Sequence, residues 1–81
     1  MYKPFSLSEQ EQYIIRAVVD FSTRNNAIWM VARAKSGRKL LSAKAPFDVD
    51  ELIRAIDCEK DYVDITTCFT DREPKFYRIR L

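Results

Sequence analysis

The chain has 81 residues, of which 47% are hydrophobic and 32% charged, with one glycine and a formal net charge of +2. This composition is typical of an ordered globular protein, and the length allows one domain with a modest core. No apolar run approaches the roughly 18 residues of a membrane-spanning helix, and residues 1–6 include no hydrophobic signal segment. We therefore expect one compact domain over residues 1–81 that is soluble, cytoplasmic and not membrane-bound.

The first predicted element is a helix from about Ser8 to Arg24. Two overlapping capping-box patterns, beginning at Ser6 and at Ser8, provide the start, and Asn25 and Asn26 provide the stop. Helical spacing places one set of residues on the inner face, with Ile15 and Val19 widening it. That set is Leu7, Glu11, Ile14, Ala17, Val18 and Phe21.

Residues 27–35 alternate with a period of two, which predicts a strand, and Ser36 and Gly37 predict a turn after it. If Lys35 faces Arg38 across this turn, a second strand follows and apolar and polar pairs separate onto two faces. The expected apolar pairs are Ile28/Ala45, Met30/Ala43 and Ala32/Leu41. The expected outer pairs are Trp29/Lys44, Val31/Ser42 and Arg33/Leu40. A one-residue slip would mix the two sets.

The second half repeats this plan. Asp48 or Asp50 caps a short helix, whose inner face is expected to be Val49, Leu52, Ile53 and Ile56. Residues 62–70 alternate as a strand, residues 71–74 form a turn, and residues 75–81 form the last strand. A five-residue loop would pair Tyr77, Ile79 and Leu81 with Phe69, Thr67 and Ile65, and on the other face Arg78 with Cys68 and Arg80 with Thr66.

The predicted order is therefore αββαββ. Two amphipathic helices and two hairpins, each with one apolar face, combine most simply as a two-layer α+β domain. In this fold a four-stranded antiparallel sheet carries both helices on one face, and its other face is open to solvent.

Charge is sorted along the chain. Residues 21–47 include six bases and no acid, and residues 48–64 include seven acids and two bases. The basic block also contains the single tryptophan, so it is the first candidate for a partner-binding surface. On the open face we expect cations beside aromatic rings, which suits an acidic protein surface or nucleic acid. A solvated polar face whose cations discourage edge pairing, with Trp29 packed under the stem of Lys44, accounts for the same pattern without a partner. The candidate residues are Trp29, Arg33, Lys35, Arg38, Lys44, Phe76, Arg78 and Arg80.

The acidic block offers an alternative binding surface on the second helix, formed by Asp50, Glu51, Asp57 and Glu59. Its spacing does not match an EF-hand loop, because a central glycine and a closing glutamate are missing. A solvated helix face with acids near the N-terminus accounts for the pattern without a ligand.

Catalytic and metal chemistry is not indicated. With no histidine, Cys58 and Cys68 are too few for a closed zinc site, and two cysteines are too few for a disulfide framework. One fragment, Asp48 followed by Glu73-Pro74-Lys75, faintly resembles the acid and acid-x-lysine arrangement of metal-dependent nucleases, but there the second element lies on a strand and here Pro74 favours a turn. We expect no enzyme activity, no cofactor and no metal.

The sequence therefore predicts a small binding protein that inhibits or regulates a larger partner by occupying its surface. Phage-borne inhibitors, including anti-CRISPR-type proteins that act on nucleic-acid-processing complexes, fit this description by size and character rather than by motif. A small nucleic-acid-binding protein is one alternative. A homodimeric accessory subunit, in which the acidic helix of one copy meets the basic hairpin of another, is a second.

Overall fold

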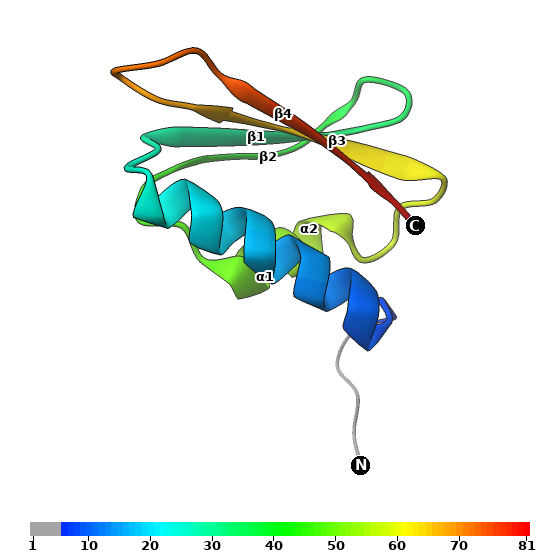
Figure 1. Ribbon diagram of the computed structural model, residues 1–81. Helices are drawn as coiled ribbons and strands as arrows, with labels where there is room; N and C mark the ends of the chain where they lie inside the picture. The colour runs from blue at the N-terminus through cyan, green and yellow to red at the C-terminus, as the bar shows by residue number, and fades with distance from the viewer. Residues whose placement is uncertain (1–5) are drawn as a thin grey trace.

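The computed structural model describes residues 6–81 and shows two helices and four strands. In chain order they are α1 (Glu9–Arg24), β1 (Trp29–Ala34), β2 (Lys39–Lys44), α2 (Val49–Ile56), β3 (Tyr62–Cys68) and β4 (Lys75–Arg80). The strands form one antiparallel sheet in the order β2-β1-β3-β4, and both helices lie on one side of it (Figure 1). The predicted two-layer α+β fold is confirmed. Residues 1–5 of the predicted domain lie outside the described residues.

The start of α1 follows from its capping box. The Ser8 hydroxyl accepts from the Glu11 amide at 3.1 Å, and the Glu11 carboxylate accepts from the Ser8 amide at 2.8 Å. Ser6, the other candidate cap, instead donates through its amide and its hydroxyl to Asp57 after α2. The reciprocal bonds satisfy two otherwise free amides, so Ser8 is the N-cap.

The inner face of α1 differs from the prediction. Its buried residues are Ile15, Val18, Val19 and Ser22, whereas Ile14 and Ala17 are exposed. Apolar side chains cover more of this helix than the sheet can bury, so periodicity alone allowed two orientations. Ser22 is tolerated inside because its hydroxyl donates to the Val18 carbonyl at 2.7 Å within the same helix.

The first hairpin has the predicted register from Trp29 to Ala32, but its turn is different. The Ala34 amide donates to the Arg38 carbonyl, so the loop has three residues, 35–37, with Gly37 at a φ of 92°. A bulge at Leu40 then restores the pairing, and Arg33 faces Lys39 instead of Leu40. Leu40 packs against the core beside Leu41, which accounts for the bulge.

The second hairpin is four residues out of the predicted register. Ile79 pairs with Val63 and Tyr77 with Ile65, so the expected pairing of Tyr77 with Phe69 and of Arg80 with Thr66 is wrong. An even shift leaves every side chain on its predicted face. The observed register sets Arg78 directly opposite Asp64, and its longer loop lets Arg72 stack over the Phe69 ring.

The core lies between the two layers. Met30, Ala32 and Ile65 from the sheet meet residues from both helices, including Ile15 and Ile53. Of the two predicted caps of α2, Asp48 is the N-cap, and it accepts from the amides of the first turn. Ile28 was expected in this core, but it precedes β1 at the end of the sheet where the chain arrives from α1, and its side chain is exposed.

Candidate functional site

The sheet face that the helices leave uncovered is the candidate site, and it is called the open face below. Its side chains form rows across the strands, because directly paired residues share a face. The rows are Lys44–Trp29–Cys68, then Ser42–Val31–Thr66–Phe76, then Lys39–Arg33–Asp64–Arg78, and last Tyr62–Arg80. The open face thus has five cations and one carboxylate.

Trp29 is exposed over 43% of its surface and is held in place. Its indole nitrogen donates to the Ser42 hydroxyl on the neighbouring strand at 2.8 Å. The bond fixes the ring orientation before a partner arrives, so little rotamer freedom is lost on binding. Trp29 therefore has the features of an interface anchor.

Phe76 projects from β4 and is 75% exposed, the largest exposed fraction of any large hydrophobic residue among residues 6–81. It lines a hollow of about 450 Å³, and the same hollow is lined by Arg33, Asp64, Thr66 and Arg78. An exposed ring beside a hollow loses solvent when a partner covers it. The uncharged second row thus provides a partly apolar strip across the sheet.

The charged row is partly neutralised. Arg78 donates through two nitrogens to the Asp64 carboxylate, at 2.8 and 3.2 Å, and its guanidinium lies 3.9 Å from the centre of the Tyr62 ring. Hydrogen bonding to Asp64 raises the pKa of Arg78, so its guanidinium stays protonated in this pair. Within residues 6–81, no carboxylate forms an ion pair with the other four cations of the open face, which are Arg33, Lys39, Lys44 and Arg80.

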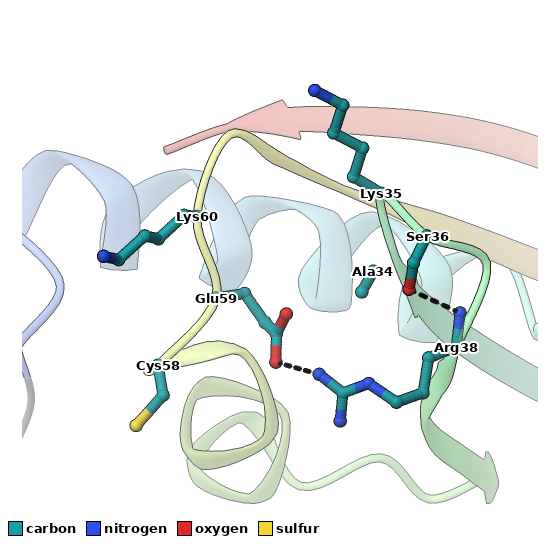
Figure 2. A pocket seen from close by; sticks show the side chains of 7 residues that line it. All are labelled: Ala34, Lys35, Ser36, Arg38, Cys58, Glu59 and Lys60. Atoms are coloured by element: carbon teal, nitrogen blue, oxygen red, sulfur yellow. Dashed lines mark hydrogen bonds and ion pairs between the residues drawn. The ribbon is translucent and has the colours of Figure 1, made fainter.

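Two residues predicted for the open face lie in the turn at its end. Arg38 pairs with buried Ala34 and extends toward the helix layer, where its guanidinium bonds Glu59 at 2.8 Å (Figure 2). Its predicted placement is wrong, because the three-residue loop shifts the strand and brings Lys39 to the open face instead. The Lys35 Nζ atom lies 3.7 Å from Oδ2 of Asp61.

The turn and the segment after α2 border a second, widely open hollow of about 520 Å³, whose lining residues are drawn in Figure 2. Its charged residues are Lys35, Arg38, Glu59 and Lys60, and exposed Cys58 lies at its margin. Both Lys35 and Arg38 already contact acids. This hollow therefore offers less free charge than the open face.

The alternative acidic surface is divided by the fold. Asp57 accepts hydrogen bonds from the Ser6 amide, the Ser6 hydroxyl and the Leu7 amide, so it ties the start of the described chain to α2. Glu59 is largely covered and pairs with Arg38. Of the four acids of this surface, Asp50 and Glu51 in the first turn of α2 are the two that are exposed, and Asp50 Oδ1 lies 3.9 Å from an Arg16 guanidinium nitrogen.

A third hollow, of about 340 Å³, lies between α1 and β4 and was missed from the sequence. It is lined by Tyr13, Ile14, Ala17, Val18, Phe21, Lys75 and Tyr77. The helical pattern had assigned Ile14, Ala17 and Phe21 to the core. The signal that could have revealed the hollow is the excess of apolar residues on α1 over what one sheet can cover.

Among residues 6–81, no three His, Cys, Asp or Glu side chains come together as a metal site. The Asp48 carboxylate accepts from the Asp50 and Glu51 amides, whereas Glu73 lies in the loop between β3 and β4. Neither helix of the described chain has the length and apolar character of a membrane span. Comparison with protein-family models, curated proteins and solved structures gave no match.

Proposed function

We propose that this protein is a non-enzymatic binding protein that inhibits or regulates a larger protein by covering an acidic area of its surface with the open face. The observation that carries the proposal is the row order. An uncharged row containing Phe76 lies between a row with Trp29 and a row with four charged residues. A partly apolar centre with a polar margin is the usual composition of a protein interface.

Trp29 supplies the anchor, and the unpaired cations supply the charge that selects an acidic partner. Phage-borne inhibitors of nucleic-acid-processing complexes, of the anti-CRISPR type, are one class of protein that works in this way. The partner surface is inferred to be that of a cytoplasmic protein, and no cofactor is required.

The test is affinity capture from the source cell with the immobilised protein, followed by mass spectrometry and measurement of the affinity for the recovered partner. Trp29→Ala should weaken binding on the order of thirtyfold, as expected for an anchor worth about 2 kcal/mol. Thr66→Arg, which fills the centre of the open face, should abolish it. Both variants should keep the wild-type circular dichroism spectrum.

The matched control is Asp50→Lys combined with Glu51→Lys, which reverses the exposed part of the acidic surface without removing the contacts of Asp57 or Glu59. This double variant should bind normally. If it loses the partner while Trp29→Ala and Thr66→Arg bind, the start of α2 is the binding surface and the open face is not.

Nucleic acid is the second candidate, favoured by the free cations beside Trp29 and Phe76. Direct phosphate contacts would give an affinity for random oligonucleotides that falls steeply with salt. We expect weak oligonucleotide binding, because Arg78 is paired with Asp64 and is not free to contact phosphate, which leaves only four separated cations on the open face. Tight, salt-sensitive oligonucleotide binding that Trp29→Ala abolishes would replace the protein-binding proposal.

The absence of catalysis is part of the proposal and has its own assay. Incubation with DNA, RNA, nucleotides and model esters in the presence of Mg²⁺ or Mn²⁺ should give no turnover. Cleavage that disappears in Glu73→Ala or Lys75→Ala would identify a nuclease instead.

A further inference from the structure

The outer edge of β4 is an unpaired strand edge. The Leu81 amide donates to the Asp61 carbonyl at 3.0 Å, which identifies that pair as hydrogen-bonded. Hydrogen-bonded and non-hydrogen-bonded pairs alternate along an antiparallel ladder. The amides and carbonyls of Phe76, Arg78 and Arg80 therefore point away from β3, and no strand within residues 6–81 pairs with them.

The third hollow runs along this edge on the helix side of the sheet. Tyr77 lines it from β4, and Tyr13 and Ile14 line it from α1 with exposed fractions of 72% and 39%. Figure 1 shows α1 beneath the sheet with β4 along one edge. A strand added to β4 would place every second side chain toward this apolar wall.

The two edges of the sheet are not equally suited to pairing. The bulge at Leu40 interrupts β2, and bulges hinder the addition of a further strand. By contrast, β4 pairs with β3 over six consecutive residues without a shift. The outer edge of β4 is regular and lies beside the apolar third hollow, so this edge can accept a further strand.

Charge decides the occupant. β4 has no acid; its Arg78 is paired with Asp64 of β3, and its Lys75 and Arg80 form no ion pair within residues 6–81. β2 carries Lys39 and Lys44 and no acid. Pairing two copies through β4, or through β4 and β2, would therefore bring cations together. An extended segment with acidic side chains complements this edge instead.

We propose that β4 binds an extended segment of another protein by strand addition, and that this segment alternates apolar and acidic residues. Its apolar side chains enter the hollow beside Tyr77 and Ile14. Its acidic side chains lie on the opposite face, next to Arg80, which forms no ion pair within residues 6–81, whereas Arg78 on the same face is already paired with Asp64. This goes beyond the proposed function, because its main anchor is the β4 main chain rather than the side chains of the open face.

The probe is a displayed library of short linear peptides selected against the purified full chain. The enriched peptides should alternate apolar and acidic residues, and a representative peptide should slow amide hydrogen exchange at Phe76, Arg78 and Arg80. Absence of enrichment, or protection elsewhere on the protein, would overturn the proposal. So would a concentration-dependent dimer whose formation protects the same amides, because the occupant would then be a second copy.

Arg78→Pro and Arg78→Ala form a matched pair. Both lose the cation and its contact with Asp64, but Pro alone also removes an edge N–H without disturbing a bond to β3. Arg78→Pro should weaken the selected peptide about tenfold more than Arg78→Ala, as expected for lost main-chain bonding. Equal affinities in two folded variants would contradict strand addition.

If Arg78→Pro fails to fold, Ile14→Asn tests the hollow from α1 without touching the sheet. It should weaken the peptide severalfold, whereas Asp20→Asn on an exposed position of the same helix should not. Equal binding by both helix variants would exclude the hollow as part of the site. Trp29→Ala should leave peptide affinity unchanged, so failure of the open-face proposal can be recognised separately.

Discussion

The covered and open faces of the sheet are built from the same alternating strands, but they balance their interactions differently. On the covered face, Met30, Ala32 and Ile65 lie fully buried against the helices. On the open face, Arg78 and Asp64 neutralise each other laterally while Trp29 is held by Ser42. Burial against the helices makes the covered face important for stability, whereas the open face is available for binding. Substitutions on the two faces should therefore affect stability and binding separately.

The largest difference is expected between charge placed on each face. Met30 is 1% exposed, so Met30→Asp would bury an unpaired carboxylate and should cost about 3 kcal/mol or more. Arg33→Gln on the open face should change stability by about 0.5 kcal/mol or less. Thermal unfolding followed by circular dichroism measures both, and equal losses would show that the two faces are assigned incorrectly. An acidic substitution at position 33 is avoided because it would face Asp64 on the paired strand and add charge repulsion.

A smaller effect is expected at the hydrogen bonds that join the residues before α1 to Asp57 after α2. Asp57→Ala leaves the Leu7 amide and both Ser6 donors without their acceptor, and it should cost about 1–3 kcal/mol in urea denaturation. Asp50→Ala, which removes an exposed carboxylate from the first turn of α2, is the control and should be nearly neutral. If the two variants unfold at the same urea concentration, the Asp57 contact contributes nothing to stability.

The lateral ion pair should contribute less than the Asp57 contact. Asp64→Asn should lower the melting temperature slightly at low salt, because Arg78 then lacks its opposite charge. High salt should largely remove the difference from wild type. A salt-independent loss would mean that packing, rather than charge, is the contribution of Asp64.

The smallest expected effect is confined to high pH and tests the boundary between the faces. Burial beside the third hollow raises the pKa of Tyr77 above the usual 10.0. Because the folded pKa is the higher one, the contribution of Tyr77 to stability is complete below pH 10 and is lost as the pH rises through the folded pKa. Ultraviolet titration should show a tyrosine that ionises late, and Tyr77→Phe should remove it.

Much of this architecture followed from the sequence. The Ser8–Glu11 capping box, the Asp48 cap and the alternation of Val63, Ile65 and Thr67 are local signals, and each has the predicted structure. These signals suffice because they act over a few residues, where backbone hydrogen bonding and side-chain direction are fixed by spacing. The two-layer fold followed because each element has one apolar face to bury.

Tertiary packing decided the remaining features. Three features depend on partners that are distant in the sequence. The first is the orientation of α1, and the second is the bulge that turns Leu40 inward and brings Lys39 instead of Arg38 to the open face. The third is the register that pairs Arg78 with Asp64. Each alternative kept the same local pattern, since an even register shift preserves the faces and a wide apolar stripe permits several helix rotations. The choice among them rests on contacts between elements, which is why the strip across the open face and the hollow beside β4 emerge only in the folded chain.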